Sequence, residues 1–111
     1  MLLEKLCNLD GVSGNEGAVR DFIKTQISSY ADDISIDNMG NLIAFKKGLD
    51  SSKKVMLSCH TDEVGFIISG ITKEGYLEFQ TVGGIDTRVI ISKKVRIGNI
   101  KGIIGLKAIH L

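Results

Sequence analysis

Apolar residues near the start of the chain recur at helical spacing. In residues 2–9, leucines stand three and four positions apart and so share one face of a helix. A second stripe of this kind runs through residues 15–30 and predicts another amphipathic helix. Ser13 followed by Glu16 matches the capping box, in which the hydroxyl and the carboxylate each satisfy a free backbone N–H at the start of a helix. The beginning of the chain therefore predicts two helices joined by a turn.

After the second helix the apolar positions alternate with polar ones, which indicates β-strands. Residues 33–47 predict a hairpin, because the sequence DNMGN in their middle offers Asn and Gly where a turn needs positive φ. The apolar run VMLSC at residues 55–59 is typical of a strand covered on both faces inside an α/β sheet. A further strand is expected at residues 64–71. Helices followed by such strands predict the α/β class.

The pattern changes again near residue 72, where short strands separated by glycines begin. The strands expected there are YLEFQTV, VIIS and a final hairpin formed by KKVRIGNIKGIIGL, with its turn at Gly98-Asn99. This change in pattern predicts a domain boundary. We expect an α/β part over residues 1–71 and a β-rich part over residues 72–111.

The composition narrows the class of protein. A hydrophobic content of 43% with 24% charged residues is typical of a globular protein. The formal net charge is +1 and the cations are scattered, which argues against nucleic-acid or membrane-surface binding. No apolar run approaches the roughly 20 residues of a membrane helix, and the start of the chain lacks a signal-peptide core. Two isolated cysteines, Cys7 and Cys59, favour the reducing cytoplasm over a disulfide scaffold.

Candidate chemistry follows directly after the apolar run, in the sequence CHTDE. Residues i and i+2 of an extended chain point the same way, so His60 and Asp62 can project from one face. A metal-bound imidazole generally donates its other ring N–H to a carboxylate or carbonyl, and α/β proteins place their sites at the carboxyl ends of strands. The pair therefore fits a metal or catalytic site. A structural histidine or an ordinary polar turn explains the same tripeptide and is the simpler interpretation of these residues alone.

Other reactive residues have structural interpretations of their own. Glu63 could be a ligand, a general base or a solvated turn residue. Cys59 adjoins the candidate site, but no second histidine near it in sequence could activate the thiol, so it is expected to be a buried small residue. Cys7 lies on the first helix stripe and is expected to pack. His110 stands in an apolar run without an acidic neighbour, which favours a core or surface position.

Five stretches of the chain, taken in order, match the start of one peptidase family. They are LDGVSGNEGAVRDFI, IDNMGNLIAFKKG, VMLSCHTDEVGFIISGI, VGGIDTRVI and GIIGLKAIHL. The chain resembles the glutamyl and deblocking aminopeptidases, two-metal exopeptidases of which some members have been described as endoglucanases. The resemblance covers nearly all of the 111 residues. Ile85 and Thr87 depart from the family pattern, which often has an aromatic residue and a proline at these positions.

The resemblance implies a zinc-peptidase-like α/β domain with two helices and a mixed sheet, which leads into the start of an inserted β-barrel domain. It also implies that His60 is a ligand of one of two divalent ions, zinc or cobalt, and that Asp62 is the carboxylate of the catalytic site that orients this imidazole. A water activated by both metals would attack the first peptide bond of a peptide substrate. The inserted domain implies assembly into large homo-oligomers, commonly dodecamers.

The family's remaining ligands and its general-base glutamate lie in segments later than this sequence. We therefore expect an N-terminal fragment of a metal-dependent aminopeptidase that is inactive alone. A different hypothesis is a non-catalytic, β-rich interaction or oligomerisation module that pairs through exposed strand edges. A glycoside hydrolase is a weaker third hypothesis, because that chemistry needs two carboxylates about 5–10 Å apart across a sugar. Asp62 and Glu63 are adjacent in sequence and would face apart in a strand.

Overall fold

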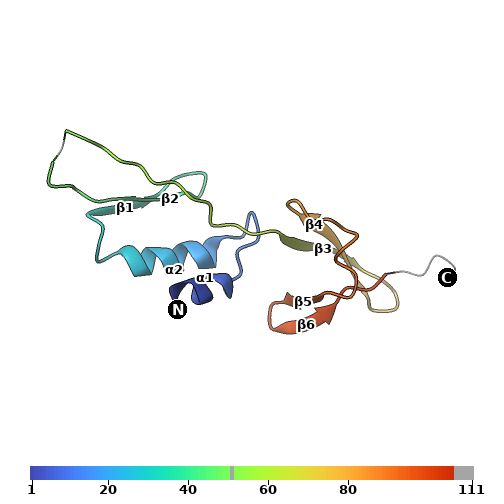
Figure 1. Ribbon diagram of the computed structural model, residues 1–111. Helices are drawn as coiled ribbons and strands as arrows, with labels where there is room; N and C mark the ends of the chain where they lie inside the picture. Colours follow the sequence, from blue (N-terminus) through green and yellow to red (C-terminus); the bar gives the residue numbers. More distant parts are fainter. Residues whose placement is uncertain (51, 107–111) are drawn as a thin grey trace.

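The computed structural model describes residues 1–50 and 52–106 of the 111-residue chain. Two helices come first, and β-strands follow them along the chain (Figure 1). The elements are α1 (Leu2–Cys7), α2 (Gly17–Ile27), β1 (Asp33–Ile36), β2 (Leu42–Phe45), β3 (Gly65–Ile71), β4 (Leu77–Val82), β5 (Lys94–Ile97) and β6 (Ile100–Ile103). The α/β class predicted from the sequence is confirmed, and so are both helices.

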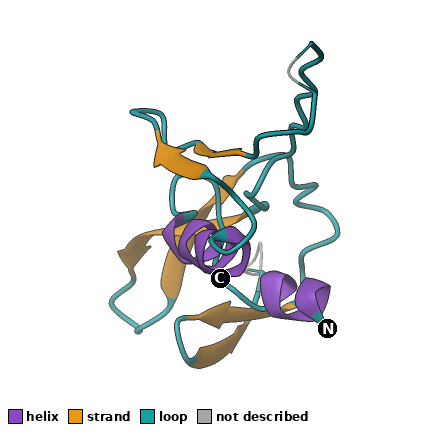
Figure 2. Ribbon diagram, turned by 90° about the vertical axis from the view of Figure 1, so that its left-hand side faces the viewer, coloured by secondary structure: helices purple, strands orange, loops and turns teal. Residues whose placement is uncertain are grey.

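The strands form separate antiparallel pairs rather than one mixed sheet. β1 pairs with β2, β3 with β4, and β5 with β6. Figure 2, in which strands are orange and helices purple, shows these pairs joined by long loops. The hairpins predicted at residues 33–47 and around Gly98-Asn99 are therefore confirmed. The boundary expected after residue 71 falls in the turn between β3 and β4, and both this boundary and the inserted barrel remain predictions.

The turn of the first hairpin is held by the side chain of Asp37. Its Oδ1 accepts hydrogen bonds from the backbone N–H groups of Met39 and Asn41 at 2.9 and 2.8 Å, and its Oδ2 accepts one from the Asn41 amide at 2.8 Å. Gly40 takes a positive φ of 86° between them. Arg20 of α2 donates to the Gly40 carbonyl at 3.2 Å, which ties α2 to the hairpin that lies beside it (Figure 1).

The strand predicted at residues 55–59 is not formed. These residues run as a long loop from the β1–β2 end of the molecule toward β3 (Figure 1), and they pair with no strand in the described part of the chain. Val55 and Leu57 are 87% and 93% exposed. A strand exists only when a neighbour satisfies its backbone N–H and C=O groups, so an apolar run without a neighbour remains a loop.

The strand predicted from VIIS is also wrong, because residues 89–92 form turns. The Asp86 carboxylate accepts hydrogen bonds from the backbone N–H and the guanidinium of Arg88, and the Asp86 carbonyl accepts one from the Val89 N–H. Ser92 has a positive φ of 64°, which a continuing strand does not allow. The side-chain hydrogen bonds of aspartate favour a turn here over a β-ladder.

The predicted capping box is wrong as well, although the helix after it is formed. Glu16 occupies the N-cap position of α2, and its carboxylate accepts a hydrogen bond from the Gly14 N–H. The Ser13 hydroxyl instead donates to the carboxylate of Asp62, 49 residues further along the chain. An ionised acceptor gives a stronger hydrogen bond than a neutral one, which accounts for this choice of partner.

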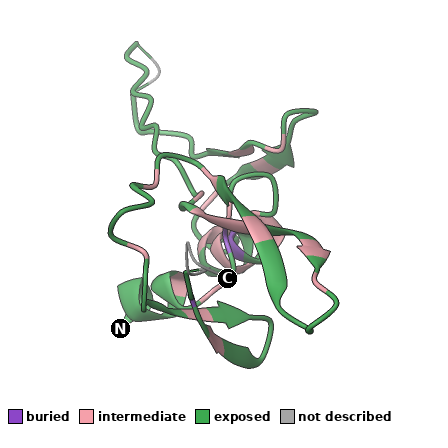
Figure 3. Ribbon diagram, turned by 90° about the vertical axis from the view of Figure 1, so that its right-hand side faces the viewer, coloured by how far each residue is buried: buried purple, intermediate pink, exposed green. Residues whose placement is uncertain are grey.

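The described residues share very little core. Val19 and Ile104 are the buried apolar side chains among them, and Figure 3 shows exposed residues over nearly the whole molecule. The radius of gyration is 19.3 Å, against about 13 Å for a compact chain of this length. Cys7 and Cys59 are both exposed, so the packed positions expected for these cysteines are wrong. The elements are formed locally and are held together by a few long-range contacts.

Candidate functional site

The loop before α2 is hydrogen-bonded to the segment that leads into β3. Val12 and Glu63 form an isolated parallel bridge. The Glu63 N–H donates to the Gly11 carbonyl at 2.8 Å, and the Ser13 N–H donates to the Glu63 carbonyl at 3.2 Å. A Cβ atom on Gly65 would lie 2.5 Å from a methyl carbon of Val12, so only glycine allows this close approach. The bridge brings a loop from the helical part next to the sequence CHTDE.

Three polar side chains form a chain of hydrogen bonds at this bridge. The Ser13 Oγ donates to Asp62 Oδ2 at 2.5 Å, and the other carboxylate oxygen, Oδ1, lies 3.1 Å from His60 Nδ1. The same Nδ1 lies 3.0 Å from the backbone oxygen of Asp62. Because both oxygens are acceptors, Nδ1 carries the proton of the neutral ring and Nε2 keeps its lone pair. The structure thus brings His60 and Asp62 together, as the sequence predicts.

The electrostatics of Asp62 favour its ionised form. The hydrogen bond from Ser13 is the main cause that holds the pKa of the Asp62 carboxyl below its ordinary value, and the neighbouring His60 adds to this effect. The carboxylate therefore stays ionised at neutral pH and remains an acceptor for the imidazole. His60 is 86% exposed, so Nε2 is open to a ligand from outside the chain.

A neutral imidazole with a free Nε2 and a carboxylate behind Nδ1 is a suitable metal ligand. Zinc takes about four ligands. In residues 1–50 and 52–106, however, no group of three or more His, Cys, Asp or Glu side chains is placed to hold a metal ion. Glu63 contributes its backbone to the bridge, and His110 lies outside the described residues. The arrangement therefore fits one corner of a metal site and not a complete one.

Ser13 is the member of this site that the sequence motif did not reveal. The S-x-x-E pattern predicts a local helix cap, and no local pattern indicates a partner 49 residues away. The pairing of residues 12 and 63 is equally non-local. Only the fold brings these residues together.

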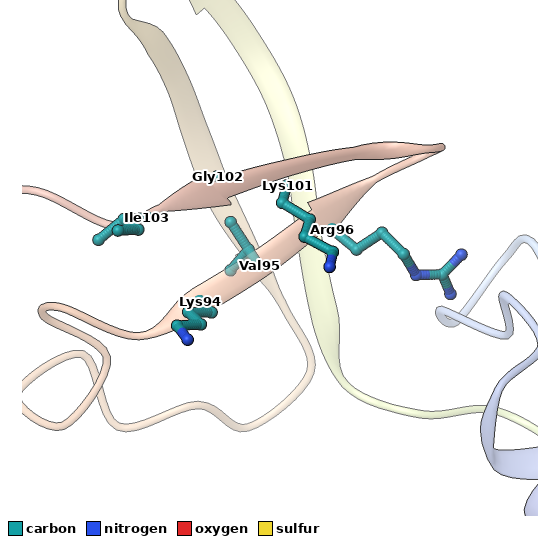
Figure 4. Close-up of a pocket in the computed structure, with 6 residues that line it drawn as sticks. All are labelled: Lys94, Val95, Arg96, Lys101, Gly102 and Ile103. Carbon is teal, nitrogen blue, oxygen red and sulfur yellow. The ribbon is translucent and has the colours of Figure 1, made fainter.

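A shallow surface depression lies elsewhere, on the β5–β6 hairpin (Figure 4). It is open and is lined by Lys94, Val95, Arg96, Lys101, Gly102 and Ile103. The Arg96 side chain extends away from the hairpin toward the N-terminal segment, where it donates to the Asp10 carboxylate. No His, Cys, Asp or Glu side chain is among the lining residues, and the depression does not include His60.

The class of protein follows from comparison with known families. The family model of the M42 glutamyl aminopeptidases matches residues 40–111. The chain belongs to this aminopeptidase family. It is 36% identical over 115 residues to the lysyl aminopeptidase of Pyrococcus furiosus, and the alignment covers 99% of this chain and 33% of that relative.

Solved structures agree with this assignment. A Thermotoga maritima protein described as an endoglucanase is 50% identical, with a TM-score of 0.88 over 95% of this chain and 34% of that chain. The TET1 peptidase of Pyrococcus horikoshii is 36% identical, with a TM-score of 0.77 over 99% of this chain and 34% of that one. The present chain thus spans about a third of the length of these relatives.

Neither helix in the described part of the chain is long and apolar enough to cross a membrane.

Proposed function

We propose that this chain is the N-terminal part of a metal-dependent aminopeptidase that removes residues from the N-termini of peptides. Membership of the M42 family supports the aminopeptidase activity. The observation that carries the metal dependence is the imidazole of His60, which Asp62 holds by Nδ1 while Nε2 is left open. His60 would be one ligand of a two-metal site that takes zinc or cobalt, and Asp62 would orient that ligand.

The two ions would supply an activated water and polarise the carbonyl of the scissile peptide bond. The residues of this chain have a narrower task. His60 would offer one nitrogen to one ion. Asp62 keeps the proton on Nδ1, so that the lone pair of Nε2 remains available for coordination. Because the described residues contain no cluster of three ligands, the chain alone is proposed to be inactive.

The surroundings of the complete enzyme belong to the same proposal. The Pyrococcus horikoshii TET1 peptidase can assemble into a tetrahedron or a large octahedral shell, and we propose a homo-oligomer for the complete protein of this family. The net charge of +1 supports peptides rather than nucleic acids or membranes as partners. Two unpaired cysteines support a cytoplasmic location.

Inactivity of the isolated chain is tested with the purified 111-residue protein and aminoacyl chromogenic substrates in the presence of zinc or cobalt. We expect no turnover above that of the metal alone, while the full-length Pyrococcus furiosus lysyl aminopeptidase serves as the positive control. Turnover that disappears in a His60→Ala variant would contradict the proposed inactivity, although it would support the role of His60.

The role of His60 is tested in a chimera in which this chain replaces the corresponding third of the Pyrococcus furiosus enzyme. The His60→Ala chimera is expected to bind less metal per subunit and to lose most of its activity. The Asp62→Ala chimera is expected to lose about 10- to 100-fold in metal affinity or activity. Glu63→Gln is the matched control, because Glu63 contributes its backbone to the bridge. Full metal content in the His60→Ala chimera would disprove the assignment.

A non-catalytic interaction or oligomerisation module is the second candidate. The observation that favours it is the set of separate two-stranded hairpins, whose outer edges are unpaired among the described residues. This candidate predicts a defined oligomer by light scattering and a cooperative unfolding transition. A non-cooperative transition together with open-ended aggregation would exclude it.

A further inference from the structure

The hydroxyl of Ser13 stands behind the His60–Asp62 pair. It donates to Asp62 Oδ2 at 2.5 Å, while Asp62 Oδ1 lies 3.1 Å from His60 Nδ1. The two oxygens of one carboxylate are thus held from opposite sides, one by a hydroxyl and one by an imidazole. A carboxylate fixed at one oxygen has lost most of its freedom to rotate, which defines where its second oxygen lies.

We infer that Ser13 is a positioning residue for His60 and that it acts through the Asp62 carboxylate. The inference rests on the proposed function, in which His60 is a metal ligand. The imidazole is 86% exposed and the Asp62 side chain is 40% exposed, so packing contributes little to their orientation. Hydrogen bonds must therefore supply the orientation, and Ser13 supplies the one that joins the pair to the rest of the fold.

Ser13 is itself held by its backbone. Its N–H donates to the Glu63 carbonyl at 3.2 Å, and the Glu63 N–H donates to the Gly11 carbonyl at 2.8 Å. These bonds fix the loop to the residue that follows Asp62 in the chain. The hydroxyl therefore reaches the carboxylate from a backbone that is already tied to the same segment, which makes the contact a fixed part of the site.

The helix that follows gives Ser13 no alternative role. Glu16 is the N-cap residue of α2, and it is the Glu16 carboxylate that accepts a hydrogen bond from the loop, at the Gly14 N–H. The Ser13 hydroxyl makes no cap hydrogen bond to α2. A serine whose hydroxyl serves Asp62 and not the helix should affect the imidazole when it is replaced, and should leave α2 intact.

The test measures the tautomer of His60 by ¹⁵N NMR in the full 111-residue chain without metal. A His110→Gln background leaves His60 as the single imidazole, since the chain has two histidines. The measurement is made in mildly basic solution, at a pH where the ¹⁵N shifts themselves show a neutral ring. We expect the Nδ1–H tautomer to predominate in this background.

Four variants separate the contributions. Ser13→Ala and Asp62→Ala are expected to shift the ring toward a mixture of tautomers, while Ser13→Thr keeps a hydroxyl and is expected to restore the Nδ1–H form. Ser52→Ala is the matched control, because it removes another serine-to-aspartate hydrogen bond, the 2.8 Å bond from Ser52 Oγ to Asp50 Oδ2. It should leave the His60 tautomer unchanged.

An unchanged tautomer in Ser13→Ala would overturn the inference, and so would a mixture of tautomers before any change at Ser13. The amide signals of Ser13 and Glu63 report whether the bridge between them survives in each variant. If Ser13→Ala loses the bridge, Ser13→Cys decides the question, because a thiol has a similar size but is a weak donor. A shifted tautomer with an intact bridge then supports the inference, and an unshifted one rejects it.

The same variants distinguish this inference from the proposed function. In the chimera with the Pyrococcus furiosus enzyme, Ser13→Ala is expected to weaken metal binding by up to about tenfold, the lower end of the range for residues that orient metal ligands. A fixed tautomer in the isolated chain with no metal bound at His60 in the chimera would reject the proposed function and leave the role of Ser13 intact. If the tautomer in the isolated chain did not respond to Ser13→Ala while the chimera bound metal normally at His60, the role of Ser13 would be rejected and the proposed function would stand.

Discussion

At the scale of single residues, His60 depends on its hydrogen bonds. The ring is exposed, and two acceptor oxygens of Asp62 face its Nδ1. A side chain held by packing would resist the loss of one polar neighbour, whereas a side chain held by hydrogen bonds does not. The residues that hold the Val12–Glu63 bridge therefore matter to the site even though they carry no chemistry of their own.

Gly65 is one such residue, and replacing it with alanine is expected to weaken the bridge. The added Cβ would lie 2.5 Å from a Val12 methyl carbon, so the loop must move away. Crowding of this kind costs about 1–3 kcal/mol. Hydrogen exchange measures the effect as faster exchange of the Glu63 and Ser13 amides, which donate across the bridge.

The control for Gly65→Ala is Gly84→Ala. A Cβ on Gly84 would meet no atom within 4 Å, and its φ lies outside the left-handed region. Exchange at the bridge should be unchanged in this control. If Gly65→Ala also left exchange at Glu63 and Ser13 unchanged, the close approach of Val12 would not be what selects glycine at residue 65.

At the scale of elements, structure that depends on neighbouring residues could be predicted from the sequence, whereas contacts between distant residues could not. The leucine spacing of residues 2–9 and the Asp-Asn-Met-Gly-Asn turn act within a few residues, and both give the expected element. The run at residues 55–59 has the composition of an inner strand, but a strand also requires a neighbour, which composition cannot supply. The hydrogen bond of Ser13 could not be predicted for the same reason, because its partner lies 49 residues away.

The first hairpin shows how a local signal acts, and Asp37→Ala is expected to fray it. The Asp37 carboxylate accepts hydrogen bonds from the N–H groups of Met39 and Asn41 and from the Asn41 amide. Without these acceptors the turn loses its side-chain support. Amide exchange at Asn41 should become faster, while Asp33→Ala on the same hairpin should have little effect. Equal exchange in the two variants would contradict this account of the turn.

The same carboxylate predicts a dependence on pH. The hydrogen bond from the Asn41 side chain is the main cause that lowers the pKa of Asp37 below its ordinary value of 3.8. A lowered pKa in the folded state means that the ionised form stabilises the hairpin at any pH above 3.8. This stabilisation is lost as the pH falls below 3.8 and through the lowered value. Amide exchange followed with pH should therefore show fraying only in acid, and Asp37→Asn should remove this acid dependence.

At the scale of the whole molecule, the chain exposes far more surface than a compact domain. Its accessible surface is 9945 Å², whereas a compact monomer of 12.0 kDa exposes roughly 6,000 Å². The chain measures 69 × 27 × 24 Å. The chain spans about a third of the length of its relatives. Many of its large apolar side chains are exposed, and apolar surface of this kind favours association.

The apolar run at residues 55–59 is the place where such association is expected to start. Its side chains are exposed on both faces, and its backbone pairs with no strand in the described part of the chain. Both features favour intermolecular strand pairing. Changing Leu57 to serine should weaken self-association, because burying a leucine side chain contributes about 1.5–3 kcal/mol and each 1.4 kcal/mol corresponds to about tenfold in an equilibrium constant.

Light scattering over a range of protein concentrations measures this effect. Leu57→Ser should shift the onset of association to about tenfold higher concentration or beyond, for the reason just given. Leu49→Ser is the matched control, because Leu49 is fully exposed but stands alone in a polar loop. Equal shifts in the two variants would mean that association follows total exposed apolar surface. A shift confined to Leu57→Ser would locate the association in the unpaired run that precedes His60. Any polypeptide that covers this run would then also lie next to the candidate metal ligand.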